Sequence, residues 1–213
     1  MSGFVPSRIQ REEFANAITH GFGVLLTLVG TPVLLYLGMK EGNWQQILGL
    51  SIYCFSLLMV YTASTVYHSI TNPWYKRAFR KIDHISIYFL IAGTHTPLLI
   101  KFLNNGLGTF YLIILWGLVA IGVIYKAFFI HRLKFLSLIF YIGLGWMAVL
   151  TVPRMLDRMN DACLYWLIIG GAFYTLGIIF YVWEKIPFGH SIWHLFVLAG
   201  SIGHFIALLY AFG

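Results

Sequence analysis

Seven apolar runs, each close to the length needed to cross a bilayer, take up most of the 213 residues of this chain. A helix needs about 20 apolar residues to span a hydrocarbon core of roughly 30 Å. The predicted spans cover about residues 15–39, 45–69, 82–102, 108–127, 135–152, 162–183 and 190–211. Only 10% of the residues are charged, whereas a soluble domain is about 25% charged. The sequence therefore predicts an all-α integral membrane protein, a seven-transmembrane helix bundle in the cell membrane.

Short polar segments separate these runs and contain residues that commonly end helices, among them Glu41-Gly42-Asn43, Asn72-Pro73 and Asn104-Asn105-Gly106. No linker is much longer than roughly a dozen residues, so we expect one seven-helix transmembrane domain over residues 15–213. Residues 1–14 are polar and have no pattern of a cleavable signal peptide. We therefore expect them to form a short cytoplasmic N-terminal tail, with the first run retained as a span.

The lysine and arginine residues predict the orientation, because cytoplasmic segments of membrane proteins are enriched in them. With the N-terminus in the cytoplasm and the C-terminus outside, ten lie in or beside cytoplasmic segments and four in outer ones. The ten are Arg8, Arg11, Lys76, Arg77, Arg80, Lys81, Lys126, Arg132, Lys134 and Lys185. The formal charge of +7 is then explained by topology and anionic lipid headgroups, and no nucleic-acid partner is expected.

Three groups of polar residues lie at run ends that this topology places at the cytoplasmic face. Ser64 and His68 end the second run, Asp83 begins the third, and His190 and His194 begin the seventh. Residues four apart on a helix share one face, so the members of each pair point in the same direction. Polar groups are costly inside a membrane, and their coincidence at one depth indicates a functional site.

The residue types in this cluster suit zinc chemistry. Three imidazoles are suitable zinc ligands and leave a fourth position for water. Asp83 would then act as general base and afterwards as acid toward the leaving group, while the Ser64 hydroxyl would stabilise an oxyanion. Simpler explanations stand beside this one. The carboxylate could interact with a helix dipole, the serine could bond a carbonyl one turn earlier, and the histidines could lie at the interface or hold an inert structural zinc.

The other histidines have different expected places. His95 and His204 lie roughly 18 and 21 Å along their helices from the cluster, at 1.5 Å per residue, so we expect them in the outer half, bonding neighbouring helices. His20 is the reserve ligand or a partner of the ligands. His84 points about 100° away from Asp83, and His131 is expected to contact headgroups from a basic loop.

Four stretches of this sequence carry a family resemblance: EFANAITHGFG at 13–23, STVYH at 64–68, KIDHISIYFLIAGTHTP at 81–97 and FGHSIWH at 188–194. With them the chain resembles the hemolysin III family, which belongs with the adiponectin and progestin receptors. The resemblance implies seven helices with the N-terminus inside, and zinc held by His68, His190 and His194. It also implies that Asp83 holds the water molecule at the zinc, with Ser64 adjacent. Kinship with membrane ceramidases implies hydrolysis of a lipid amide, with a membrane lipid as the substrate.

Three functions follow as hypotheses. The first is a zinc-dependent hydrolase of a lipid amide. The second is a non-enzymatic sensor or regulator of membrane state with structural zinc. The third is a pore-forming protein, which the scattered polar residues outside the cluster disfavour because a pore needs a continuous polar stripe. No soluble protein partner is implied, since the outer loops are short.

Overall fold

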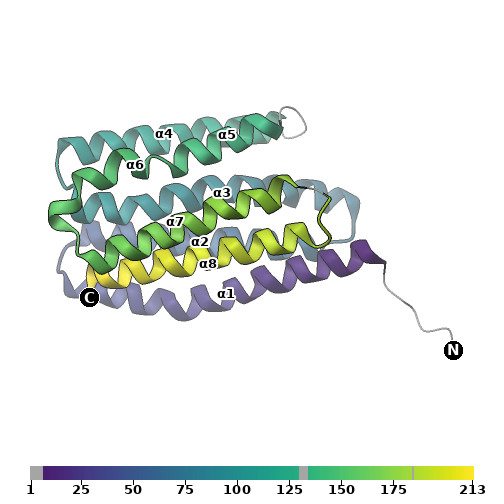
Figure 1. The fold of residues 1–213 in the computed structure, drawn as a ribbon, viewed down its shortest axis with the longest axis horizontal. Coiled ribbons are helices and arrows are strands. Elements are labelled where there is room, and N and C mark those ends of the chain that lie inside the picture. Colours follow the sequence, from purple (N-terminus) through teal and green to yellow (C-terminus); the bar gives the residue numbers. More distant parts are fainter. Residues whose placement is uncertain (1–6, 130–133, 184) are drawn as a thin grey trace.

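The computed structural model describes residues 7–129, 134–183 and 185–213. Within these ranges every regular element is a helix (Figure 1). His131 and Arg132, for which the sequence predicted headgroup and cytoplasmic positions, lie outside the described residues. In chain order the elements are α1 (Arg8–Lys40), α2 (Trp44–Ser69), α3 (Pro73–Phe102), α4 (Gly106–Phe129), α5 (Lys134–Gly145), α6 (Ala148–Thr151), the 3-10 turns η1 (Val152–Arg154) and η2 (Leu156–Arg158), α7 (Asp161–Val182) and α8 (Gly189–Phe212).

Asparagine side chains begin four of these helices. Asn43, Asn72, Asn105 and Asn160 each accept a backbone N–H bond from the first turn that follows, at 2.7–3.0 Å. The first N–H groups of a helix have no partner within the helix, so a side-chain oxygen at this position stabilises its start. All four residues lie in the polar segments that the sequence predicted between spans.

Two helices begin well before their apolar runs. Helix α1 starts at Arg8, where Ser7 and Gln10 form reciprocal capping bonds at 3.3 and 2.8 Å. Helix α3 starts at Pro73 rather than near residue 82. The hydropathy pattern misses these turns because they are polar, although they are as helical as the apolar part. The fifth span is interrupted instead: α5 ends at Gly145, and α6 and η1 complete the segment.

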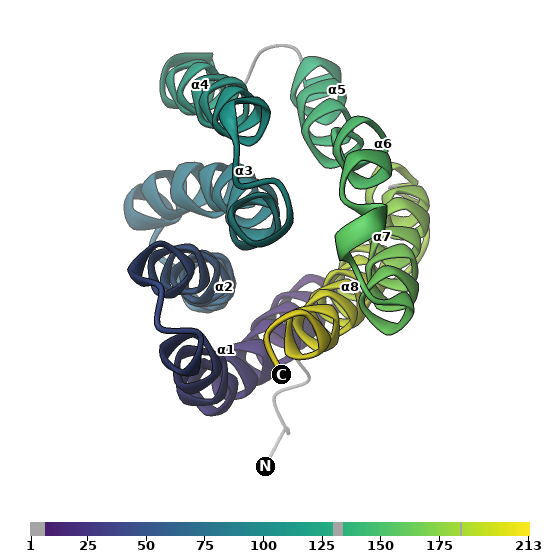
Figure 2. The same ribbon diagram turned by 90° about the vertical axis from the view of Figure 1, so that its left-hand side faces the viewer.

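The helices form a ring when the bundle is viewed from its end (Figure 2). Helix α1 packs between α2 and α8, α3 packs against α2 and α4, and α7 packs against α8. Helix α8 begins at the same end of the bundle as α1, and the C-terminus lies at the opposite end (Figure 1). This arrangement brings the end of α2 beside the start of α8.

Close packing inside the ring contrasts with an apolar outer surface. Tyr53, Tyr61 and Tyr88 are fully buried, and at Gly203 a side-chain carbon would lie 2.9 Å from the Gly170 Cα, so α7 and α8 touch through their backbones. Many large apolar side chains face outward, as expected for contact with lipid. Among the described residues, seven segments are long and apolar enough to cross a membrane. The prediction of a multi-pass, seven-helix membrane protein is confirmed.

Candidate metal centre

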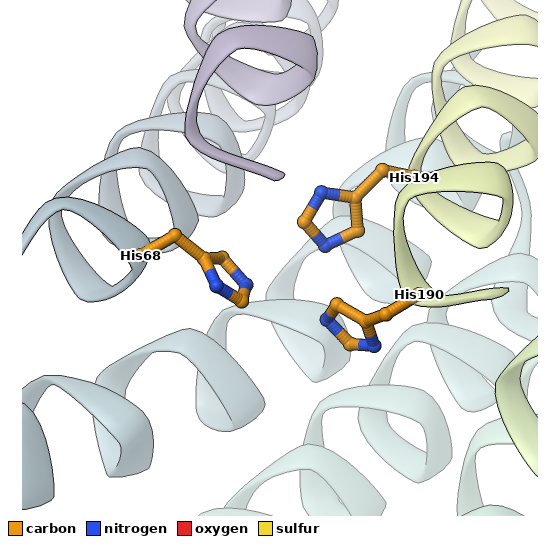
Figure 3. A group of neighbouring side chains, drawn as sticks. All are labelled: His68, His190 and His194. Atoms are coloured by element: carbon orange, nitrogen blue, oxygen red, sulfur yellow. The ribbon is translucent and has the colours of Figure 1, made fainter. Parts of the chain in front are cut away.

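Three histidines from two helices meet at one end of the bundle. His68 lies in the last turn of α2, and His190 and His194 lie in the first two turns of α8. One ring nitrogen from each lies within 4.8 Å of the other two, and the three rings point toward one another (Figure 3). Their ring centres are 4.6–5.2 Å apart. This group could hold a metal ion, because neutral imidazole nitrogens converging on one point are what zinc and related metals bind.

Hydrogen bonds determine which ring nitrogens face the centre. The Nδ1 atom of His68 lies 3.1 Å from Glu13 Oε2, and that of His194 lies 3.3 Å from both the Asn16 carbonyl oxygen and Thr19 Oγ1. If each Nδ1–H donates to these acceptors, Nε2 keeps its lone pair. The Nε2 atoms of His68 and His194 are buried and have no hydrogen-bond partner within the described part of the chain. Metal-binding histidines commonly have this arrangement, with one nitrogen anchored and the other open.

Glu13 connects the centre to a second charged residue. Its Oε2 atom accepts a bond from Lys76 Nζ at 2.6 Å, and Lys76 also donates to the backbone carbonyls of Tyr67 and Ile70 at 3.2 and 3.3 Å. The lysine thereby satisfies carbonyls at the end of α2, the helix that carries His68. The contacts join α1, α2 and the start of α3 around one imidazole.

Asn16 connects α1 to α8. Its side-chain oxygen accepts a 2.5 Å bond from Ser191 Oγ, while its backbone carbonyl faces His194. Glu13, Asn16, Thr19 and Lys76 were not predicted from the sequence to be part of the site. A signal was present for the first three: they are spaced by three residues, which places them along one face of a helix. Glu13 was instead counted with the N-terminal tail.

The start of α8 has an unusual backbone. Phe188, the residue before Gly189, has φ 56°, the only positive φ of a non-glycine residue within the described ranges. This left-handed conformation is costly for a residue with a side chain, on the order of 1–3 kcal/mol, and such residues cluster at functional sites. The Phe188 N–H donates to Glu12 Oε1 at 3.2 Å. Helix α1 therefore helps to hold the turn from which His190 projects.

Asp83 and Ser64 lie at the same end of the bundle as the three histidines. Asp83 is 8% exposed and Ser64 is 1% exposed. The carboxyl group of Asp83 interacts electrostatically with both His68 and Ser64, and the Ser64 hydroxyl makes no hydrogen bond of standard geometry to another described residue. The helix-dipole explanation for Asp83 is wrong, because α3 begins at Pro73 and Asp83 lies almost three turns inside it. The catalytic roles of both residues remain predictions.

His20 lies beside the centre without joining it. Its ring stacks on that of His194, with ring centres 3.5 Å apart and an interplanar angle of 9°. It is buried, and neither ring nitrogen has a partner among the described residues. The ring edge contacts Tyr61 at 5.2 Å between centres. His20 is thus a packing neighbour of a candidate ligand, and its role as a reserve ligand or partner stays a prediction.

The outer histidines bond backbone carbonyls. The His204 ring nitrogen Nε2 lies 3.3 Å from the Leu167 carbonyl of α7, as the sequence predicted for a contact between neighbouring helices. His95 differs, since its Nδ1 lies 2.9 Å from the Ile91 carbonyl of its own helix. His84 is half-buried on α3, and its carbonyl accepts a bond from the Tyr141 hydroxyl at 2.9 Å.

Seven membrane helices that bring three histidines together at one end define the class: a multi-pass membrane protein with a candidate metal centre. The chain belongs to the haemolysin-III-related family, whose family model matches residues 9–205. The resemblance drawn from the four sequence stretches is therefore confirmed.

Similar proteins come from bacteria and mammals. The chain is 42% identical over 200 residues to a hemolysin-3 homolog of Bacillus subtilis (strain 168), covering 94% of each chain. It is 39% identical over 200 residues to hemolysin-3 of Bacillus cereus, covering 94% of this chain and 91% of that one. The human monocyte to macrophage differentiation factor is 32% identical over 205 residues, covering 92% and 83%. No solved structure is significantly similar to the chain.

Proposed function

We propose that this protein is a zinc-dependent hydrolase that cleaves an amide bond of a membrane lipid. His68, His190 and His194 would hold the metal. The observation that carries the proposal is the pair of buried, open Nε2 atoms on His68 and His194, each on a ring whose Nδ1 faces an acceptor. A buried polar atom without a partner is costly. Two such atoms beside a third imidazole are readily explained by an ion that binds all three.

When bound, zinc acts as a Lewis acid: it polarises a carbonyl group and lowers the pKa of a water molecule that it binds. The chain's own residues would supply the remaining steps. Asp83 would remove a proton from the attacking water and return it to the departing amine nitrogen. The Ser64 hydroxyl, one turn before His68 on α2, would donate a hydrogen bond to the carbonyl oxygen as negative charge develops there. Burial of both residues strengthens these interactions, because little water competes.

A membrane lipid is the substrate class that the position of the site favours. The histidines lie at the ends of helices whose outward faces carry large apolar residues. Acyl chains could therefore remain in the bilayer while the amide group reaches the end of the bundle. With the N-terminus in the cytoplasm, as the basic residues predict, this reaction would take place at the inner leaflet.

A structural metal is the second candidate, and one observation favours it. The three histidines belong to α2 and α8, so an ion there would join these two helices, and hydrogen bonds already connect them to α1 and α3. Such a protein would be a sensor or regulator of membrane state in which the metal is required for stability alone.

One experiment separates the two candidates. Metal content is measured by mass spectrometry on detergent-purified protein, and hydrolysis of a long-chain lipid amide is measured on the same preparation. If the protein is a hydrolase, we expect zinc in wild type and in the variants Asp83→Asn and Ser64→Ala. Wild type should form product, Ser64→Ala should form it more slowly, and Asp83→Asn should form none. Zinc without product from a set of lipid amides, together with a fall in thermal stability on chelation, would favour the structural role.

A further inference from the structure

The turn that connects α7 to α8 determines how two of the candidate ligands enter the metal centre. His190 follows Phe188 by two residues, and His194 lies one turn further along α8. The Gly189 N–H donates to the Ile186 carbonyl at 3.0 Å, so the chain turns tightly just before the helix. Phe188 has φ 56° in this turn, a left-handed conformation that is unfavourable for a residue with a side chain. The conformation therefore needs support from its surroundings.

Helix α8 is capped differently from the helices that begin with asparagine. Phe188 occupies its N-cap position, and a phenylalanine side chain cannot accept a hydrogen bond from the first turn. In many helices the third residue reaches back and accepts a bond from the N–H of the cap residue. In α8 that residue is Ser191, whose hydroxyl donates instead to Asn16 Oδ1 of α1 at 2.5 Å. The N–H of Phe188 bonds outside α8.

Glu12 of α1 supplies the acceptor for this N–H. Its Oε1 atom accepts the bond from Phe188 at 3.2 Å, and the same oxygen accepts a bond from Arg8 Nε at 2.8 Å. Arg8 lies four residues earlier on α1, so it holds the carboxylate on the face of α1 from which it reaches the turn. Asn16 lies four residues later on the same face. Glu12 and Asn16 therefore contact the start of α8 together.

Two adjacent glutamates of α1 hold the two helices that carry the ligands. Neighbouring residues on a helix point about 100° apart, and α1 packs between α2 and α8. Glu13 accordingly contacts the His68 ring of α2 at 3.1 Å, whereas Glu12 contacts the backbone of Phe188 at the start of α8. The convergence of the three imidazoles depends on how the first turn of α8 is directed toward α2. A support that fixes Phe188 also fixes that direction.

We propose that Glu12 is a positioning residue for the candidate metal centre. Its carboxylate holds Phe188 in the left-handed conformation and thereby sets the direction from which His190 and His194 approach the metal. The inference rests on the metal site of the proposed function, and it holds whether the metal is catalytic or structural. Because Glu12 acts through the backbone, its loss changes the affinity for the metal and leaves the three ligands in place.

The first test measures zinc affinity of the detergent-purified protein by competition with a chelator. Glu12→Ala should weaken the affinity roughly three- to tenfold, the loss expected for one hydrogen bond. Glu12→Gln should stay within about twofold of wild type, since its amide oxygen still accepts the N–H bond. The matched control is Glu41→Ala, which removes a carboxylate of similar exposure, 31% against 30%, from the other end of α1. It should bind zinc as wild type does.

The second test separates positioning from a general effect on stability. Glycine adopts a positive φ readily, so the turn in Phe188→Gly no longer needs the carboxylate. In this background Glu12→Ala should weaken zinc binding by less than about twofold, because the supported conformation is already accessible. A general loss of stability would weaken zinc binding equally in both backgrounds. If Phe188→Gly does not fold, Phe188→Asn takes its place, since asparagine also tolerates the left-handed region.

Three results would overturn the inference while leaving the metal site intact. Wild type and Glu12→Ala could bind zinc equally well. Glu12→Ala could weaken binding to the same extent with phenylalanine and with glycine at position 188. Glu12→Gln could weaken binding as much as Glu12→Ala, which would assign the effect to the charge instead of the hydrogen bond. A well-folded wild type that binds no zinc would instead overturn the metal site of the proposed function, and this inference with it.

Discussion

The two halves of the bundle use histidine in different ways. At the end where α1 and α8 begin, His68, His190 and His194 bring three ring nitrogens within 4.8 Å of one another. In the other half, His95 and His204 each lie near a backbone carbonyl. Both halves leave buried ring nitrogens without a partner, on His68 and His194 in one and on His95 and His204 in the other.

The difference teaches that an unpaired imidazole nitrogen alone does not mark a site. The candidate metal centre is distinguished by convergence and by anchoring from other helices: Glu13, Asn16 and Thr19 of α1 face the distal nitrogens of the ligand rings. The outer histidines have backbone anchors and no third ligand of this kind within the described part of the chain.

The largest expected effect is the complete loss of metal from His190→Ala/His194→Ala. Two of three ligands are removed, and one imidazole cannot retain a divalent ion through purification. The control is His95→Ala/His204→Ala, which should keep one metal ion per chain. Mass spectrometric metal analysis of both proteins decides the matter. If the two double variants contained the same amount of metal per chain, the histidines of the two halves would not differ in metal binding.

Asp83→Asn should abolish catalysis while the metal stays bound. An amide cannot accept a proton from water, and loss of a general base lowers rates by about 10²–10⁴-fold. The measurement pairs hydrolysis of a lipid amide with metal content. Full activity in Asp83→Asn would exclude the carboxylate as the general base. Another buried group at this end of the bundle would then have to accept the proton.

Glu13→Gln should weaken metal affinity by about 10–100-fold, as is usual when the hydrogen-bond partner of a metal-binding histidine is changed. The matched control is Glu41→Gln at the opposite end, where the carboxylate pairs with Lys101. Competition with a zinc chelator of known affinity measures both. An affinity unchanged by Glu13→Gln would show that its contact with His68 does not orient the ring.

The smallest expected effect is that of His95→Ala alone. It removes a bond within one helix, and hydrogen bonds inside membrane proteins contribute about 0.6 kcal/mol on average. Unfolding in a denaturing detergent should show a decrease below about 1 kcal/mol in stability, with metal content unchanged. A large loss of metal would mean that the two halves are coupled.

The sequence was sufficient to predict much of the candidate site. Spans alternate in direction, so Ser64, His68, Asp83, His190 and His194 were predicted at one end from chain order alone. It did not identify Glu13 as a contact of His68, because that contact depends on how α1 is rotated against α2. The pairing of Asn16 with Ser191 across α1 and α8 was hidden for the same reason.

Lys126 is a second residue whose surroundings could not be predicted from the sequence. A lysine near the end of an apolar run is normally counted as a loop charge. Here α4 continues past it to Phe129, and its ammonium nitrogen lies 5.8 Å from the centre of the Tyr141 ring on α5; the residue is buried. Hydropathy reports the composition of a segment and contains no information about which neighbour covers a given side chain.

The sequence by itself determined the class of molecule, the seven spans and the end of the bundle at which the polar residues gather. The physical reason is that the hydrocarbon thickness sets the length of each span, and the cost of unpaired backbone groups in lipid leaves helices as the way for such apolar runs to cross. The tertiary structure alone decided which atoms meet at the three convergent imidazoles and their anchors on α1, and it alone decided that Lys126 is buried. Those contacts depend on helix rotation, tilt and close packing, which are set by side chains far apart in the chain.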